Sequence, residues 1–233
     1  MVMAPLKARR PYRSPQREEH AHATNQRVLR VASALFAERG YAGTTIRSVA
    51  AEAKVSVPTV EALFGTKSRL LKAAIDVAIA GDDEPVPMLD RDWATAVASA
   101  TDVENLLSVI AAVLAPAQAR SSGLVLSVFE GAGSDPELAG LAAQMSAQRA
   151  TMAAWVVTRI VALGALRGEV GEDEAVDTVY ALMEPAVFDR LTRQRGWTRA
   201  RYEEWIARSL RHLLVADAGQ ERRSTTRERT AHE

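Results

Sequence analysis

The chain has 233 residues, which is long enough for one large domain or for a small domain joined to a larger one. It contains no cysteine, so disulfide frameworks, thiol catalysis and cysteine-ligated metal sites are excluded. The net charge is zero, but residues 1–80 hold 13 Lys and Arg against 6 Asp and Glu, whereas the remaining residues hold 16 against 23. A basic end on a neutral protein indicates an anionic partner for that end, commonly nucleic acid and less commonly a membrane surface.

Residues 1–20 are predicted to be a disordered basic arm, because they are rich in Pro, Arg and Gln and have almost nothing to bury. The arm could follow a DNA groove or stay solvated, and its basic residues are Lys7, Arg9, Arg10, Arg13 and Arg17. No apolar block follows them, so they do not form a secretory signal. No apolar run reaches the roughly 18 residues that a membrane span needs. We therefore expect a cytoplasmic protein without a membrane segment.

Residues 21–81 are predicted to form a small helical domain. A helical period of apolar residues begins near residue 24, and Gly40 is well placed to end this helix. Thr44 or Thr45 can cap a short second helix that ends near residue 53.

A third, equally short helix is predicted over residues 57–63. Ser56 can cap it, and Pro58 is tolerated because the N–H groups of a first turn are unpaired. Thr66 can cap a longer helix, which places Lys67 beside a helix N-terminus, a good position for a phosphate contact. Two short helices joined by a tight turn in a basic segment are typical of a helix-turn-helix DNA reader. The alternative is a generic three-helix bundle whose charges form a solvated face.

The acidic segment 81–92 is predicted to be a linker, since proline interrupts it twice. Beyond it, helices are predicted over 102–119, 121–131, 135–163, 173–195 and 198–216. Asp102 and Asp135 are plausible N-caps, and the pair Glu184–Pro185 predicts a kink or break. No strand pattern is convincing. The fold class is therefore all-α: a helix-turn-helix three-helix unit, a larger helical body over 82–216 and a disordered tail over 217–233.

The stretch FAERGYAGTTIRSVAAEAKVSVPTVEALFGTKSRLL resembles the N-terminal DNA-binding domain of the TetR-type repressors. The matching pieces are Phe36-Ala37-Glu38-Arg39-Gly40-Tyr41, Thr44-Thr45-Ile46, Val49-Ala50, Val55-Ser56, Thr59, Phe64 and Lys67. The resemblance covers about residues 22–72. It departs from the family pattern at Pro58, often a glycine, at Val60, often a tyrosine, and at Ala62, often aromatic or histidine.

The resemblance implies a homodimer in which one domain binds an operator and the other binds a small ligand that lowers DNA affinity. It assigns DNA contacts to Thr45, Arg47, Lys54, Ser56, Val57, Thr59, Val60, Glu61 and Lys67. Val57, Val60 and Glu61 are expected to be exposed on the recognition helix. A valine there could touch a thymine methyl, and Glu61 could accept a hydrogen bond from cytosine N4.

The body is predicted to bind a mostly apolar or amphipathic ligand and to form the dimer. The ligand candidates, most of which could equally be core residues, are Trp93, Gln144, Met145, Gln148, Met152, Trp155, Tyr180, Met183 and Glu184. The last two long helices are predicted to pack as a four-helix bundle across a two-fold axis. The interface candidates are Leu182, Phe188, Leu191, Ile206, Leu210 and Leu213.

Catalytic constellations are not visible in the sequence, so neither an enzyme nor a cofactor nor a metal site is predicted. His20 and His22 are taken as incidental. The sequence thus predicts a cytoplasmic homodimeric transcriptional regulator, a repressor that an unknown small-molecule effector releases from a double-stranded DNA operator. The alternative is a helical small-molecule-binding or structural dimer without specific DNA readout.

Overall fold

The computed structural model describes residues 15–81 and 92–216, in which helices are the regular elements and the predicted all-α class is confirmed. The helices are α1 (Pro15–Gly43), α2 (Ile46–Glu52), α3 (Val57–Phe64), α4 (Lys67–Ala80), α5 (Asp92–Ala98), α6 (Val103–Gly131), α7 (Pro136–Ala162), α8 (Glu172–Leu182), α9 (Pro185–Asp189), the π-helix η2 (Arg190–Gln194) and α10 (Arg199–Leu214). A single antiparallel bridge joins Leu166 to Val215 within this part of the chain.

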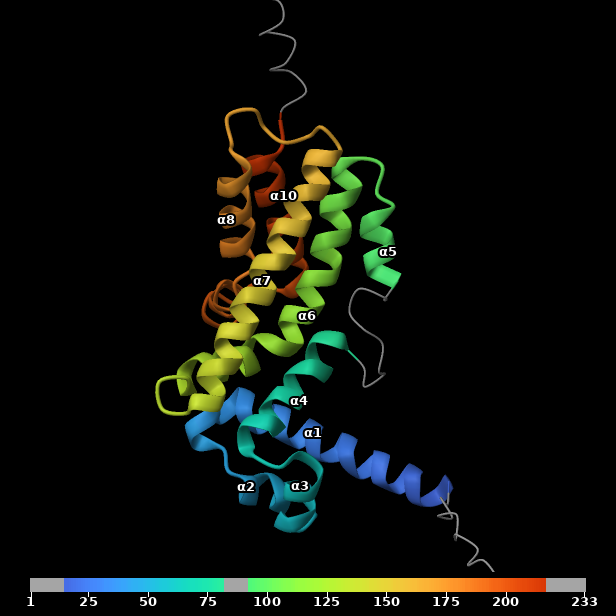
Figure 1. Ribbon diagram of the computed structural model, residues 1–233, viewed down its shortest axis with the longest axis vertical. Coiled ribbons are helices and arrows are strands. Elements are labelled where there is room, and N and C mark those ends of the chain that lie inside the picture. Colours follow the sequence, from blue (N-terminus) through green and yellow to red (C-terminus); the bar gives the residue numbers. More distant parts are fainter. Residues whose placement is uncertain (1–14, 82–91, 217–233) are drawn as a thin grey trace, which may run out of the picture.

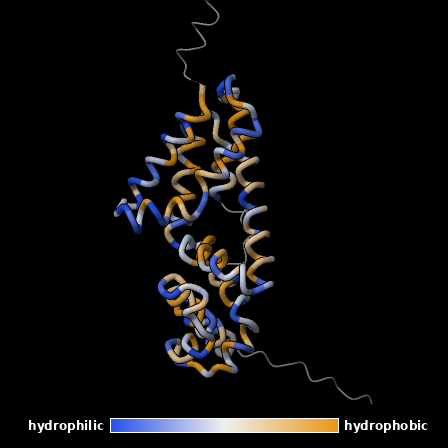
Figure 2. The backbone as a smooth tube through the Cα atoms, turned by 90° about the vertical axis from the view of Figure 1, so that its left-hand side faces the viewer, coloured by the Kyte–Doolittle hydropathy of each residue, from blue (hydrophilic) through white to orange (hydrophobic). Residues whose placement is uncertain are grey.

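The four N-terminal helices gather at one end of the molecule, and α5 to α10 form the body beyond them (Figure 1). The central helix is α6, which packs against α1, α4, α5, α7, α9 and α10. Its length and composition alone would suffice to cross a membrane, but many of its apolar residues, such as Leu106, Leu107 and Leu124, are buried among these neighbours. Figure 2 shows hydrophobic stretches recurring along both ends of the molecule.

The small N-terminal unit does not have a core of its own. Its buried cluster begins with Val28, Phe36 and Leu70, and it continues into Val128 at the end of α6 and Leu138 at the start of α7. A second buried cluster fills the body around α6, α7, α8 and α10. The end of the molecule that carries α2 and α3 is therefore packed onto the last turns of α6 and the first turn of α7.

Side-chain caps define where most helices begin, as the sequence predicts. Backbone N–H groups donate to the side chains of Thr45, Ser56, Thr66, Asp102 and Asp135. The cap of α2 is Thr45 rather than Thr44, whose hydroxyl is buried and donates to the Gly40 carbonyl oxygen at 2.9 Å. Gly40 itself has a φ of 66°, which breaks the helical path of α1 where the sequence predicts its end.

Two predicted boundaries are wrong. Helix α1 begins at Pro15, so residues 15–20 are helical and not part of a disordered arm. The two helices predicted over 102–119 and 121–131 form the single helix α6, which continues through Pro116. Near the predicted boundary, Arg120 donates to the Ala78 carbonyl and Ser121 to the Ala117 carbonyl.

The predicted break at Glu184–Pro185 is confirmed, because α8 ends at Leu182 and α9 begins at Pro185. Proline has no N–H to donate and its ring crowds the carbonyl of the preceding turn, which favours a break here, although α6 continues through Pro116. The predicted linker (apart from its ends), the predicted tail and the arm residues Lys7, Arg9, Arg10 and Arg13 lie outside the described residues, as does the side chain of Arg17.

Candidate nucleic-acid interface

The turn between α2 and α3 is fixed by backbone bonds and one long side chain. The Val55 N–H donates to the Ala50 carbonyl at 3.0 Å, and Arg27 of α1 donates from Nε to the Ala53 carbonyl at 2.9 Å. Lys54, at the corner, has a φ of 55°, a left-handed conformation that is unfavourable for a residue with a Cβ. This conformation helps to set the angle between the two short helices. The Lys54 side chain is exposed.

Helix α3 exposes a small and nearly uncharged face. Its exposed residues, which we call the recognition face, are Pro58, Glu61, Ala62 and Leu63. The prediction that Val60 is exposed is wrong, because its exposed fraction is 0% and it belongs to the core cluster. Val57 is half-buried and packs against the same cluster. Residues three apart lie on one side of a helix, so Val57 and Val60 share the inner face.

Exposed cationic side chains of this domain lie on the elements next to α3 rather than on α3 itself. Arg47 on α2 and Lys54 at the turn are exposed, as predicted for phosphate contacts. Arg69 on the first turn of α4 is exposed as well, and it was absent from the predicted set. Thr45, Ser56 and Thr59 lie at these helix ends, where the hydroxyls of Thr45 and Ser56 serve as caps. The sequence signal for Arg69 was its place three residues after the Thr66 cap.

Lys67 is used inside the protein. Its Nζ donates to the carbonyl oxygens of Tyr41 at 3.0 Å and Thr44 at 3.1 Å, and it lies 3.7 Å from the centre of the Tyr41 ring. Burial lowers the pKa of Lys67. Two of the three N–H groups of Lys67 therefore bond the backbone between α1 and α2. The third N–H group remains available to a phosphate.

A polar junction joins this end of the molecule to α7. The Tyr41 hydroxyl donates to Oδ2 of Asp135 at 2.6 Å, and Glu137 accepts from the hydroxyls of Thr66, at 2.8 Å, and Ser68. Burial and the Asp135 carboxylate raise the pKa of Tyr41 to about 12, so its hydroxyl stays protonated as the donor. The bond from Tyr41 lowers the pKa of Asp135, and the bonds from Ser68 and Thr66 lower that of Glu137.

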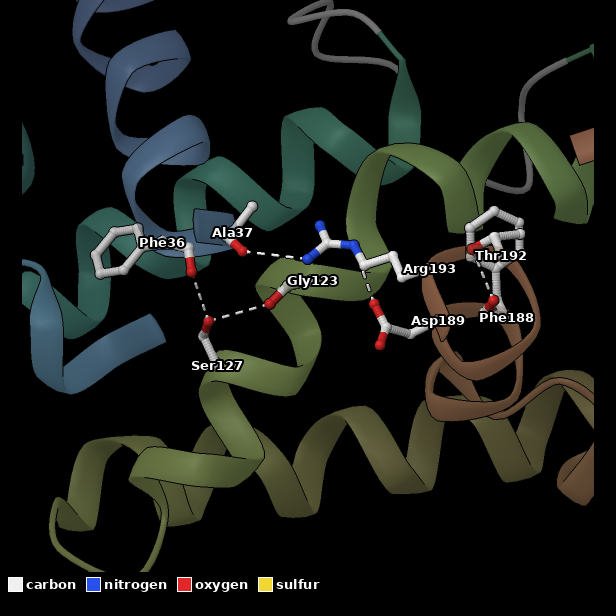
Figure 3. A network of polar contacts seen from close by, with 8 residues as sticks. All are labelled: Phe36, Ala37, Gly123, Ser127, Phe188, Asp189, Thr192 and Arg193. Carbon is white, nitrogen blue, oxygen red and sulfur yellow. Dashed lines mark hydrogen bonds and ion pairs between the residues drawn. The ribbon is translucent and has the colours of Figure 1, made fainter. Parts of the chain in front are cut away.

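A second junction joins α1 to α6 and η2 (Figure 3). The Ser127 hydroxyl is bonded to the carbonyl oxygens of Phe36 and Gly123, each at 3.0 Å. Arg193 on η2 reaches the Ala37 carbonyl oxygen from Nη1 at 3.4 Å and is held by Asp189 at 3.1 Å. The irregular segment after the Pro185 break thus contacts the helix that supports α2 and α3.

Three of the predicted ligand residues meet in the body at the break between α8 and α9. Arg149 of α7 pairs with Glu184 at 2.5 Å and donates to the Tyr180 hydroxyl at 2.7 Å. Gln118 of α6 donates to the Met183 carbonyl at 2.8 Å. The sequence prediction missed Arg149 and Gln118, although Arg149 stands out as a lone charge between Glu137 and Arg159 on α7.

The remaining predicted ligand residues lie elsewhere. Trp93 and Trp155 pack edge to face with ring centres 6.2 Å apart. Met145 packs against the first core cluster, and Met152 is half-buried. Gln144 and Gln148 are exposed on the outer side of α7 and do not join the interior group. No cluster of three His, Asp or Glu that could hold a metal occurs in residues 15–81 and 92–216.

The predicted dimer interface needs correction. Ile206 and Leu210 have an exposed fraction of 0% and Phe188 one of 6%, so these three residues belong to the core of one chain and are not available to a partner. Phe188 packs edge to face on Tyr202, with ring centres 4.8 Å apart. Leu182 and Leu191 are half-buried, and Leu213 is 44% exposed.

Known proteins resemble this chain in sequence and in fold. The family of bacterial regulatory proteins named tetR matches residues 28–74. The HTH-type transcriptional repressor Rv3405c of Mycobacterium tuberculosis is 48% identical over 60 residues, which are 26% of this chain and 30% of that relative. The chain thus matches less than a third of the length of this curated relative.

Two solved structures show the same fold over most of the chain. A transcriptional regulator from Saccharomonospora viridis in complex with choline has a TM-score of 0.63 and 18% identity, over 84% of this chain and all of that one. A SmeT–triclosan complex has a TM-score of 0.62 and 16% identity, over 84% and 93% of the two chains. At these identities the likeness concerns the fold alone. Residues 28–74 match the N-terminal domain of the tetR family of bacterial regulatory proteins.

Proposed function

We propose that the chain is a sequence-specific DNA-binding transcriptional regulator, and specifically a repressor that a small, mostly apolar ligand releases from its operator. The observation that carries the proposal is the exposure of α3, which lies at the end of the molecule away from the body (Figure 1); its recognition face is exposed, and so are Arg47 on α2, Lys54 at the turn and Arg69 on α4. Small side chains let a helix enter the major groove deeply, and surrounding cations hold the phosphates. A cytoplasmic location follows from this function.

The exposure pattern revises which residues read bases. Val60 is withdrawn from the DNA-binding set because it is buried, and Ala62 takes its place as the apolar contact to a thymine methyl. Glu61 remains the residue that accepts from cytosine N4. Arg47, Lys54 and Arg69 supply the phosphate contacts, while Lys67 acts mainly by holding the corner beneath them.

The dimer is proposed to form through α8, whose exposed charges are acidic, and α10, whose exposed arginines outnumber its one exposed acid, Glu204. The exposed acids of α8 are Glu172, Asp173, Glu174 and Asp177, and the exposed arginines of α10 are Arg199, Arg201 and Arg208. In a two-fold arrangement each α8 meets the α10 of the other chain, so the charges complement each other twice. Leu213 is the apolar contact within that seam.

The test is fluorescence anisotropy of the full chain with the DNA flanking its own coding region and with scrambled DNA of equal length, across a salt series. We expect tight binding to the native flank alone. Arg47→Ala should weaken all binding and reduce the salt slope by about 1, whereas Glu61→Gln should alter preference at one base position. If the flank shows no preference, selection from random DNA decides whether another operator exists.

The rival function is a ligand-binding or structural dimer without specific readout. One observation favours it: α3 has no cation and no exposed aromatic residue, and Glu61 is its one charge. Under this alternative, binding would be weak, steeply salt-dependent and equal for native and scrambled DNA, and selection from random DNA would yield no common sequence.

A further inference from the structure

Arg149 and Glu184 form an ion pair inside the body, and the two partners are not equally fixed. Besides Glu184, the Arg149 guanidinium contacts the Tyr180 hydroxyl, and its central carbon lies 4.3 Å from the Tyr180 ring centre. The side chain of Arg149 is 11% exposed, whereas that of Glu184 is 29% exposed. Turning Glu184 out to water is therefore much easier than expelling Arg149.

Glu184 also stands at a weak point of the backbone. It is the N-cap residue of α9, yet its side chain makes no capping hydrogen bond there. The helix is already interrupted on both sides of it, by the end of α8 at Leu182 and by Pro185. A rotation of the Glu184 side chain thus breaks the ion pair with Arg149. It breaks no capping hydrogen bond, because the side chain makes none.

Two buried polar atoms at this place lack a partner among the described residues. They are Nε of Arg149 and Oε1 of Gln118, a residue that is 5% exposed. The rest of both side chains converges on the Met183–Glu184 break from α7 and α6. A guanidinium with an unused N–H can bind a carboxylate through two parallel hydrogen bonds, which a single contact to Glu184 does not achieve. The neighbouring half-buried Met183 and Val187 are apolar.

We propose that Arg149 is the headgroup site for a small carboxylate with an apolar body, which binds in place of Glu184. A cationic ligand would have to replace the deeper and better held partner, so the anion is the favoured class. The regulatory consequence rests on the proposed function. Once Glu184 is displaced, α9 and η2 lose their tie to α7, and Arg193 withdraws from the Ala37 carbonyl of α1 (Figure 3). The reading end of the molecule then loses its polar contact with η2, while the bond from Ser127 to the Phe36 carbonyl remains.

The test measures thermal unfolding of the full chain with octanoate, decanoate and dodecanoate, each beside its matched alcohol and primary amine. The carboxylates should raise the midpoint, and the alcohols and amines should not. Glu184→Gln, which removes the internal competitor, should bind decanoate about tenfold more tightly. Arg149→Gln should abolish binding, whereas Arg159→Gln, a control on the same helix whose Nη2 bonds the Ala98 carbonyl, should keep it.

The site is overturned if no carboxylate stabilises the chain, if alcohols or amines act as well, or if Glu184→Gln leaves the decanoate affinity unchanged. If Arg149→Gln fails to fold, the decanoate affinity of Glu184→Gln compared with that of the unaltered chain still tests the site. DNA binding is measured separately by anisotropy with and without decanoate. A chain that never binds DNA refutes the proposed function while the unfolding data still judge the site. If the chain binds both DNA and decanoate, and decanoate does not change the DNA affinity, the regulatory link through Arg193 is refuted.

Discussion

The hydroxyl of Tyr41 donates a 2.6 Å hydrogen bond to Asp135, which joins the end of α1 to the residue that caps α7. The Tyr41 ring stacks on Phe36, with ring centres 6.2 Å apart, and lies under Lys67. Gly131 leaves room for this contact, since a Cβ there would lie 2.9 Å from the Tyr41 ring. A movement of the first turn of α7 therefore reaches the corner that supports α2 and α3.

Tyr41→Phe should lower the free energy of unfolding by about 1 kcal/mol, because it removes one hydrogen bond to a carboxylate and keeps the ring. Urea unfolding monitored by circular dichroism measures the change. Tyr202→Phe is the matched control, because the Tyr202 hydroxyl is buried without a partner in the part of the chain that the structure describes. The control should be neutral or stabilising; equal losses in both variants would mean that the bond to Asp135 contributes nothing.

Acid should weaken the junction that joins the ends of α1 and α4 to the start of α7. The hydrogen bonds to Asp135 and Glu137 lower the pKa of both carboxyl groups in the folded state. Their contribution is therefore complete above the unfolded values of about 4, and it is lost as the pH falls through the lower folded values. The urea concentration at the unfolding midpoint should therefore decrease as the pH is lowered from about 4 through the folded pKa values of the two carboxyl groups.

Glu137→Gln tests which group is responsible for this acid sensitivity. The amide keeps an acceptor for Thr66 and Ser68 but cannot titrate, so the variant should be less stable at neutral pH and less sensitive to acid. The same slope of stability against pH in both proteins would exclude Glu137 as a source of the effect.

Lys54 combines backbone strain with an exposed charge at one position. Lys54→Gly and Lys54→Ala both remove the charge, but glycine alone relieves the φ of 55°. The glycine variant should be about 1 kcal/mol more stable than the alanine variant. Both should show the same loss of DNA affinity, measured by anisotropy. If the two variants differ in DNA affinity as well, the angle of the turn and not the charge governs binding.

The helix starts and the break at Pro185 were predictable because they depend on local chemistry. A Thr, Ser or Asp side chain that accepts from the N–H groups two or three residues later forms the same bond in any fold. Pro185 disfavours a continuous helix through its missing N–H and its ring, although α6 accommodates Pro116. These rules located the caps of α2, α3, α4, α6 and α7 from neighbouring residues alone.

Burial was harder to predict because it depends on residues distant in sequence. Ile206 and Leu210 have the spacing of an interface helix, and the same spacing serves the core of a single chain. Val60 lies on a helix of two turns, which is too short for periodicity to separate the inner face from the outer. The meeting of Gln118, Arg149 and Glu184 could not be predicted, since three separate helical elements bring them together.

Val60→Ala tests its reassignment from DNA reader to core. It should destabilise the chain by about 2 kcal/mol through the lost contacts and the cavity left behind, with base preference unchanged below the unfolding temperature. Ala62→Ser, on the recognition face, should show the opposite pattern of little change in stability and an altered preference at one position. A shift in base preference from Val60→Ala would return Val60 to the reading surface.

Leu213→Glu tests the proposed dimer seam. Leu213 is 44% exposed in one chain, so a charge there should not disturb the fold, but it should be costly once a partner covers it. We expect the dimer dissociation constant to rise at least about tenfold in sedimentation equilibrium, with the helical signal retained. Leu63→Glu is the matched control, because Leu63 is 41% exposed and lies on the recognition face. It should weaken DNA binding and leave the dimer intact. A dimer that tolerates Leu213→Glu would place the two-fold axis away from the end of α10.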